Sequence, residues 1–314
     1  MSFSPEALER LKLLEDKFSS MGQDLVSYLD GLLYANFTTY WDYIKLDTLL
    51  SLQSTKTDFP DEKIFVVYHQ ITELYFNLCL HELEQIQAQE KPTAQFLLSR
   101  IKRINQYFDA LIRSFGVMVE GMDREQFLKF RMSLLPASGF QSAQYRKIEI
   151  CSTDFNNLLV KEKRNMPEFD QMGTEDLFEH IYWKTGATEL ASGKKTLTLR
   201  QFEDKYSAEL IELASYSRHN NLWTKYNKAD KTAEEEAELG EQLRELDLNV
   251  NVRWPMQHMR SASRYLDKKP EAIAATGGTN WQKYLPPRFQ LRIFYPSLWS
   301  SDELENWGRS SFGE

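Results

Sequence analysis

Residues 61–88 read DEKIFVVYHQITELYFNLCLHELEQIQA, and this stretch decides the fold. Apolar side chains recur in it every three or four residues, which predicts a helix with a wide apolar face. A helix of that kind is buried on most sides, so we expect it near the middle of a helical domain. His69 lies on the apolar side between Phe65 and Ile71. An ionisable ring in that position needs a partner or a function.

The composition of the chain favours helices throughout. The chain has 314 residues, 42% of them hydrophobic and 27% charged, which is ample for a large core. It contains only 13 glycines and 10 prolines, as expected of long helices joined by few tight turns. No shift in composition divides the sequence. We therefore predict an all-α fold in which residues 1–314 form a single large domain.

Charge and cysteine content exclude several classes of protein. The net charge of -8 argues against non-specific binding to nucleic acid or to an anionic membrane. No apolar run approaches the roughly 20 residues of a membrane span, and the N-terminus does not resemble a signal peptide. Two cysteines, Cys79 and Cys151, cannot form a disulfide framework. We expect a cytoplasmic protein.

Outside the central helix, the pattern predicts long helices over residues 5–34, from about 93 to 119, and over 199–228. Residues 230–245 are strongly acidic and are interpreted as a solvated helical face or a helical hairpin. The stretch 274–289 is the glycine-rich loop of the sequence. Residues 151–245 as a whole form a variable, partly acidic helical region.

Common catalytic motifs are absent. Neither cysteine has the neighbours of a zinc finger, and paired Glu-x-x-His motifs of a di-iron bundle do not occur. The glycine-rich phosphate loops and the serine-hydrolase elbow are missing as well.

Two lone histidines on aromatic-rich helices remain as candidates for chemistry. His258 follows Trp254 by four residues, on the same helical face, with Pro255 between them. A helical protein can hold a haem through one axial histidine, so His258 and His69 could be a proximal and a distal residue. Spacing alone does not decide this, because a satisfied core histidine is the more common outcome.

Two further features also have a structural and a functional interpretation. Arg131, beside Phe127 and Phe130, either forms an internal salt bridge or provides a fork for a ligand carboxylate. The loop 276–279, Thr-Gly-Gly-Thr, is either a helix C-cap followed by a turn or a lid that contacts a ligand.

Taken together, five stretches of the chain resemble the tryptophan 2,3-dioxygenase family. They read YWDYIKLDTLLSLQ, IFVVYHQITELYF, FLKFRMSLLPASGFQSAQYRKIE, WPMQH and ATGGTNWQKYL, and they cover most of residues 38–150 and 246–299. The order HQ-x-x-EL followed by SGFQS-x-QYR-x-IE is highly specific. The resemblance implies a homotetramer with one haem b per subunit, active as Fe(II), lying between long helices. The implied reaction inserts both atoms of O2 across the indole C2–C3 bond of L-tryptophan, giving N-formyl-L-kynurenine.

The resemblance also assigns roles around the haem. His258 matches the axial ligand of the haem iron, and Trp254 belongs to the same W-x-x-x-H pattern. His69 matches the distal catalytic histidine that meets the indole N–H. Phe65 matches an aromatic wall of the substrate pocket. Phe127 stands where some members have a tyrosine near the substrate carboxylate, which implies one hydrogen bond fewer.

The charged end of the substrate has its own implied partners. Arg131 matches the arginine that pairs with the carboxylate, and Thr276 matches a threonine that contacts the ammonium and carboxylate groups. Tyr40, Tyr43 and Ile44 match part of an N-terminal segment, residues 1–45, that reaches into a neighbouring subunit's pocket.

The chain departs from the family pattern at three places, and the departures at Phe127 and at Asn280-Trp281 leave alternatives open. Pro255 replaces the residue after the tryptophan, and Asn280-Trp281 stands where a small or glycine-rich pair is usual. One alternative is a haem-dependent monooxygenase of an aromatic amino acid. Another is a haem or tryptophan sensor without turnover.

Overall fold

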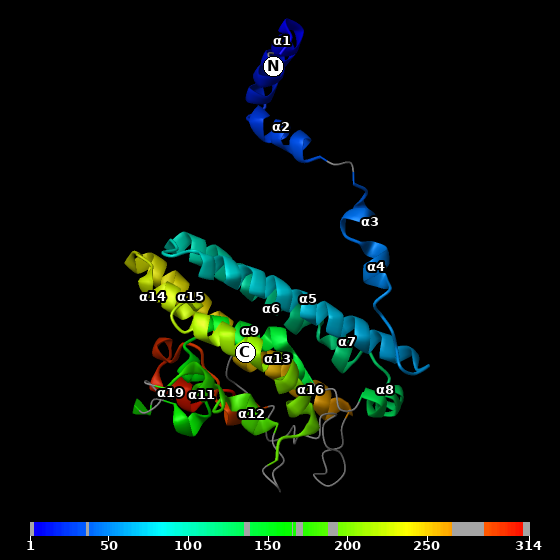
Figure 1. Ribbon diagram of the computed structural model, residues 1–314, viewed down its shortest axis with the longest axis vertical. Coiled ribbons are helices and arrows are strands. Elements are labelled where there is room, and N and C mark those ends of the chain that lie inside the picture. The colour runs from blue at the N-terminus through cyan, green and yellow to red at the C-terminus, as the bar shows by residue number, and fades with distance from the viewer. Residues whose placement is uncertain are drawn as a thin grey trace. The chain divides into compact units, whose positions relative to one another are not determined.

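The computed structural model describes residues 3–35, 38–134, 139–164, 166–167, 172–187, 194–265 and 286–309. Helices dominate every described range of ten residues or more (Figure 1). These ranges contain no strand, and an isolated antiparallel bridge joins Leu159 and Ile181. The all-α prediction is confirmed. None of the described helices is long and apolar enough to cross a membrane.

The chain folds into two compact units, Met1–Ser54 and Thr55–Glu314. No change in composition marks the boundary between them, which is why the sequence predicted a single domain. That the two units act as one domain stays a prediction.

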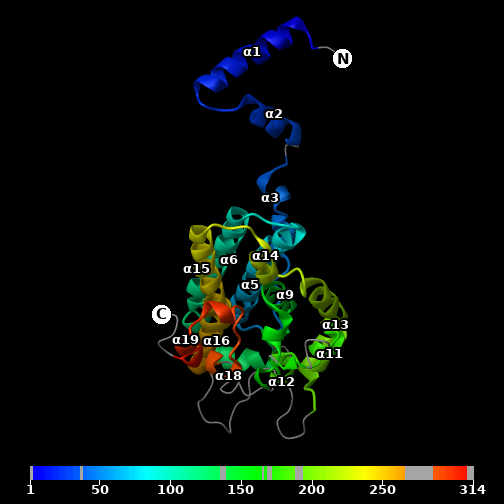
Figure 2. The ribbon, with the colours of Figure 1, turned by 90° about the vertical axis from the view of Figure 1, so that its left-hand side faces the viewer.

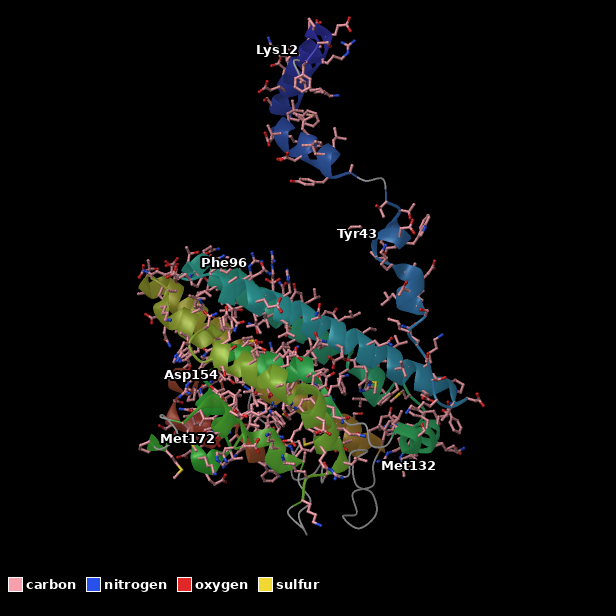
Figure 3. The ribbon with its side chains drawn as sticks, in the orientation of Figure 1. Lys12, Tyr43, Phe96, Met132, Asp154 and Met172 are labelled. Atoms are coloured by element: carbon pink, nitrogen blue, oxygen red, sulfur yellow. The ribbon has the colours of Figure 1, made fainter. Side chains whose placement is uncertain are left out.

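The N-terminal unit consists of four short helices: α1 Pro5–Ser20, α2 Leu25–Tyr34, α3 Tyr40–Tyr43 and α4 Leu46–Leu50. The predicted single helix over residues 5–34 is wrong. The chain leaves the helix at Gly22, whose φ of 66° suits glycine, and Asp24 caps the next helix by accepting from Val26 and Ser27. None of the four helices contains a buried residue. Figure 3 shows the side chains of this unit, with Tyr43 labelled.

The larger unit is built around α5, Pro60–Ala88, which closely matches the central helix expected from the sequence. Proline in its first turn has no N–H to leave unsatisfied, and two acidic residues, Asp61 and Glu62, favour the positive end of the helix dipole. The buried carboxylate of Glu62 also accepts the backbone N–H groups of Lys56 and Thr57. These bonds fix the loop that leads into α5.

The helix α5 lies along one side of this unit, and its Ile71, Leu74 and Leu78 are 39%, 54% and 42% exposed, so the prediction that it is buried on most sides is wrong. The other helices of this unit are α6 Ala94–Ser114, α7 Gly116–Val119, α8 Arg124–Phe130, α9 Ala143–Ser152, α11 Thr174–Phe178, α12 Tyr182–Gly186, α13 Leu197–Ser217, α14 Leu222–Lys228, α15 Ala233–Leu248, α16 Trp254–Tyr265, α18 Pro287–Gln290 and α19 Ser301–Glu305, with short 3-10 turns between several of them. Both ribbon views show α6 beside α5 (Figures 1 and 2).

The core lies where α5 meets α6 and α9. Phe76, in the middle of α5, is 2% exposed, and its ring lies 6.0 Å from that of Phe108 and 5.4 Å from that of Tyr145. It also meets Trp254 edge-on at 5.8 Å. Burying an aromatic side chain of this size stabilises the fold by about 2–3 kcal/mol. Phe76 thereby couples α5 to the helix that carries His258.

Three predicted elements differ from the structure in where they end. The second long helix stops at Ser114, and a separate turn, α7, continues to Val119. The helix expected over 199–228 is broken at residues 218–221, where Asn221 caps α14 by accepting from Thr224. The acidic stretch is helical for most of its length, with Leu239 and Leu243 buried while several glutamates face solvent.

A buried carboxylate attaches a later segment to the end of α15. Asp247 accepts hydrogen bonds from the backbone N–H groups of Phe294 and Tyr295, at 2.9 and 3.1 Å, and from Trp299 Nε1 at 3.0 Å. The Asn251 side chain donates a fourth bond at 2.7 Å. Burial raises the pKa of Asp247 to about 6, although these donors act to lower it.

Candidate active site

A widened turn introduces the helix that carries His258. Residues Asn249–Arg253 form a π-helix between α15 and α16, and the N–H of Trp254 donates to the carbonyl of Asn249, five residues earlier. Insertions of this kind shift the face that a following helix presents, and they occur often at functional sites. The sequence predicted helix here without the change of register.

The His258 imidazole is arranged as a metal ligand would be. Its Nδ1 lies 3.1 Å from the carbonyl oxygen of Trp254, so Nδ1 carries the proton and donates it. This bond leaves the lone pair on Nε2. Within the described residues, Nε2 forms no hydrogen bond. Burial lowers the pKa of His258 to about 4, so the ring is neutral near pH 7.

Aromatic rings fix the orientation of this imidazole. The ring of Phe115 lies 4.7 Å away and that of Trp254 is also 4.7 Å away, nearly edge-on. Phe115 in turn contacts Tyr68, whose hydroxyl lies 3.2 Å from the carbonyl of Leu111. A neutral, oriented imidazole with a free Nε2 has the donor chemistry of an axial haem ligand. The residues present therefore fit a haem held by His258.

His69 lies on α5 within electrostatic range of His258, since a charge on His69 lowers the pKa of His258. The Nδ1 of His69 donates to the carbonyl of Phe65 at 2.8 Å, which leaves Nε2 as an acceptor. The side chain is exposed rather than buried as the apolar face of α5 predicted, and desolvation by the surrounding protein lowers its pKa. His69 is therefore a neutral imidazole whose acceptor atom a ligand can reach.

Aromatic side chains line the same region as His69. The Phe65 ring lies 4.1 Å from the imidazole, 6.3 Å from Phe127 and 5.8 Å from Phe130. Phe127 also packs 4.6 Å from Tyr265, near the end of α16. The structure thus brings Phe65, His69 and Phe127 together, as the sequence predicted. Such a lining suits a neutral, planar ligand.

Arg131 follows α8 and begins a 3-10 turn, Arg131–Leu134, where the sequence predicted a continuing helix. The side chain is only 4% exposed, and burial lowers the pKa of its guanidinium. Burying a guanidinium is costly, because the charge leaves water. The change from α-helix to 3-10 turn occurs at this residue, next to Phe130 of the aromatic lining.

The structure does not place the remaining predicted residues relative to this site. Thr276 falls outside the described residues, as does the pair Asn280-Trp281. Tyr40, Tyr43 and Ile44 belong to the N-terminal unit, where they are 71%, 77% and 37% exposed.

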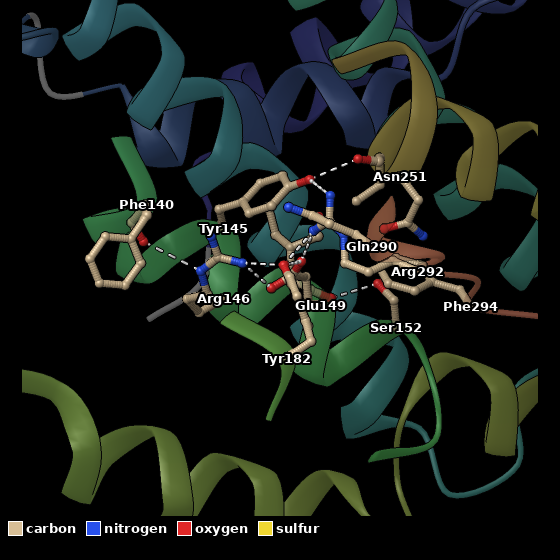
Figure 4. Close-up of polar contacts among 12 residues, drawn as sticks. Phe140, Tyr145, Arg146, Glu149, Ser152, Tyr182, Asn251, Gln290, Arg292 and Phe294 are labelled. Carbon is tan, nitrogen blue, oxygen red and sulfur yellow. Dashed lines mark hydrogen bonds and ion pairs between the residues drawn. The ribbon is translucent and has the colours of Figure 1, made fainter. Parts of the chain in front are cut away.

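Sequence reasoning missed a buried ionic network centred on α9 (Figure 4). Glu149 of α9 accepts from Arg146 at 2.6 Å, and its other oxygen binds Arg292 and the hydroxyl of Tyr182. Arg292 also donates to the hydroxyl of Tyr145 at 3.3 Å. Both arginines and the glutamate are less than 10% exposed. One carboxylate thus pairs with two guanidinium groups, and the hydroxyls of Tyr182 and Tyr145 accept further N–H groups from them.

A signal for this network was present in the sequence. Arg146 and Glu149 are three residues apart on a helix whose neighbouring residues Ile148 and Ile150 are buried. Charges at that spacing on an apolar helix indicate a buried pair. Arg292 gives no comparable signal, because it lies far along the chain.

Comparison with known proteins agrees with this geometry. A family model described as tryptophan 2,3-dioxygenase matches residues 33–229. A protein named tryptophan 2,3-dioxygenase from Exiguobacterium sibiricum is 31% identical over 83% of this chain and 91% of its own length. Proteins of the same name from Ruegeria sp. (strain TM1040) and Bacillus anthracis are 27% and 28% identical, over 85% and 83% of this chain and 92% and 91% of their own lengths.

The family model covers more than half of the chain, and the relatives align over most of both lengths. The match includes the central helix with His69, the α8 region with Arg131, and the QYRKIE stretch of α9. The chain belongs to the tryptophan 2,3-dioxygenase family of oxidoreductases.

Proposed function

We propose that this protein catalyses the haem-dependent cleavage of the indole C2–C3 bond of L-tryptophan by O2, giving N-formyl-L-kynurenine. The observation that carries the proposal is the pair of neutral imidazoles, His258 and His69, in one aromatic region of a chain that belongs to this family. The bound cofactor is haem b, one per subunit, and it supplies the redox chemistry with O2 when its iron is ferrous.

His258 is the residue that holds the haem. Its Nδ1–H is committed to the carbonyl of Trp254, so Nε2 is the atom that would bind the iron. Hydrogen bonding of Nδ1 to an oxygen also raises the basicity of the ligand. Packing against Phe115 and Trp254 keeps the ring from rotating.

His69 positions the indole. Its Nε2 accepts the indole N–H, because Nδ1 already donates to Phe65. Its lowered pKa keeps the ring neutral, and only a neutral imidazole can accept. Phe65 and Phe127 flank the apolar ring, exclude water and hold the reacting carbons in a fixed orientation.

Arg131 binds the substrate carboxylate, and Thr276 contacts the ammonium and carboxylate groups. A guanidinium matches a carboxylate through two parallel N–H bonds, which fixes direction as well as charge. L-Tryptophan presents such a carboxylate, whereas tryptamine does not.

Turnover of the haem-loaded protein tests this function. The protein is reduced, mixed with L-tryptophan and O2, and the products are followed by absorbance and mass. We expect N-formyl-L-kynurenine carrying both atoms of labelled O2. A product with a single added oxygen would indicate a monooxygenase, and tight binding without product would indicate a sensor.

We propose further that the N-terminal unit packs on a neighbouring subunit within a homotetramer. Its helices bury none of their residues, and Leu33 and Tyr34 are 80% and 84% exposed. An exposed apolar surface of this extent is typical of an interaction site. Tyr40, Tyr43 and Ile44 are the residues of this unit that reach a neighbour's substrate.

Replacing Leu33 and Tyr34 together with serine is expected to weaken assembly about 100-fold, because each side chain contributes about 1.5–3 kcal/mol when it is buried. Light scattering at several concentrations measures the effect. Serine at Leu197 and Tyr216, which are 51% and 56% exposed on α13, is the matched control and should leave assembly intact. Unchanged assembly in the Leu33/Tyr34 variant would contradict this role.

A further inference from the structure

The π-helical turn before α16 lacks one of its expected hydrogen bonds. In the register set by Trp254, which donates to the carbonyl of Asn249, the next residue would donate to the carbonyl of Val250. That next residue is Pro255, which has no N–H. Val250 is fully buried, so water does not readily replace the missing donor.

A side chain from another helix provides the donor. The hydroxyl of Tyr145, on α9, donates to the carbonyl oxygen of Val250 at 2.7 Å. The Tyr145 side chain is itself buried, 7% exposed, and its ring packs against Phe76. The bond joins residues 105 positions apart in the sequence, so it links two elements that no local interaction connects.

The ionic network determines which way the Tyr145 proton points. Arg292 Nη2 lies 3.3 Å from the Tyr145 oxygen, and a guanidinium can only donate. The phenol must therefore accept from Arg292, which leaves its own proton for Val250. Arg292 is held in turn by Glu149 and by the Tyr182 hydroxyl at 2.6 Å (Figure 4).

We propose that Tyr145 is a positioning residue for His258: its hydroxyl replaces the backbone donor that Pro255 lacks, and it thereby fixes the turn from which the His258 helix projects. Pro255 lies three residues before His258, and Trp254, which bonds to and packs on the imidazole, adjoins it. A rotation of this turn would therefore move the ring directly. The hydroxyl of Tyr145 thus compensates for the N–H that Pro255 lacks.

The role of Tyr145 in positioning His258 for haem rests on the proposed function. Its role in replacing the backbone donor that Pro255 lacks does not. The test therefore uses two measurements on the full-length protein. One is the unfolding equilibrium of the haem-free chain in urea. The other is haem retention, followed by the Soret band and by transfer of haem to an excess of apomyoglobin.

Tyr145→Phe is expected to increase the unfolding equilibrium constant and the rate of haem loss about tenfold each, since it leaves a buried carbonyl without its donor. Pro255→Ala in the same chain restores an N–H in the required register. We expect the double variant Y145F/P255A to return both quantities to within about threefold of the wild type. Pro255→Ala alone should change little, because a carbonyl accepts two bonds.

Tyr182→Phe is the control. It removes a buried hydroxyl from the same ionic network but leaves the bond between Tyr145 and Val250 in place. Its defects should persist when Pro255→Ala is added. The proposal is overturned if Pro255→Ala fails to rescue Tyr145→Phe, or if it rescues Tyr182→Phe equally well.

The two measurements separate the inference from the proposed function. If the wild type retains haem, selective rescue of haem loss supports the positioning role, and rescue of unfolding without any effect on haem loss overturns it. If the wild type does not bind haem at all, the proposed function is wrong, and so is the positioning role of Tyr145. The unfolding data alone then decide whether the Tyr145 hydroxyl replaces the missing backbone donor.

Discussion

His258→Ala is expected to abolish stable haem binding, with an affinity at least about 100-fold weaker than that of the wild type. The replaced imidazole is the neutral ring whose Nδ1 is held by the carbonyl of Trp254, and its Nε2 is the atom that would bind the haem iron in the proposed function. Absorbance at the Soret band after gel filtration measures the retained haem. Circular dichroism should show that the helical fold is preserved.

Two comparisons make this result specific to the ligand. His219→Ala removes an exposed histidine and should retain haem normally. Free imidazole added to His258→Ala should restore part of the haem spectrum, because it can occupy the space of the lost ring. An unchanged Soret band and haem content in His258→Ala would disprove the assignment.

Arg131→Met is expected to weaken binding of L-tryptophan about 100-fold or more while it changes tryptamine binding less than about threefold. Methionine retains much of the apolar stem of the arginine but removes the guanidinium, and loss of one partner of a buried charged pair costs about 2–5 kcal/mol. Tryptamine has no carboxylate, so it does not gain from the arginine. Anaerobic titration of the ferrous protein measures both affinities.

Arg131→Lys refines this test. Lysine retains the charge but lacks the planar fork, so we expect an intermediate loss for L-tryptophan. If L-tryptophan and tryptamine lose affinity equally in Arg131→Met, the arginine supports the pocket without binding the carboxylate.

Periodicity predicted the extent of the central helix well but not its burial, because Ile71, Leu74 and Leu78 of its apolar stripe are exposed. The helix begins at Pro60 and ends at Ala88, within one residue of the quoted stretch at its start. The two histidines were also visible in the sequence. Each is an ionisable ring on an apolar face, and such a residue stands out from its neighbours. Spacing could not decide their role. In both residues the role depends on a hydrogen bond from Nδ1 to a backbone carbonyl, which leaves the Nε2 lone pair available, and hydrophobic spacing does not reveal such a bond.

Helix ends and long-range contacts were harder to predict. Hydrophobic spacing predicted one helix over residues 5–34, but the chain turns at Gly22, whose φ lies in the left-handed region. At Arg131 the chain tightens into a 3-10 turn, although its composition still favours a helix. Hydrophobic spacing did not predict the π-turn at Asn249–Arg253, and the bond to its Val250 carbonyl comes from Tyr145 on another helix. Such tertiary bonds cannot be inferred from periodicity.

The attachment at Asp247 has a consequence for the order in which the protein is made. The carboxylate lies next to the π-turn, but three of its four donors belong to Phe294, Tyr295 and Trp299. During synthesis, His258 leaves the ribosome before these residues do. Until these three residues have been synthesised, Asn251 is the only one of the four donors that can bond to Asp247. The turn before His258 then lacks the contacts with residues 294–299. We therefore expect a nascent chain to capture haem only after residues 294–299 have emerged.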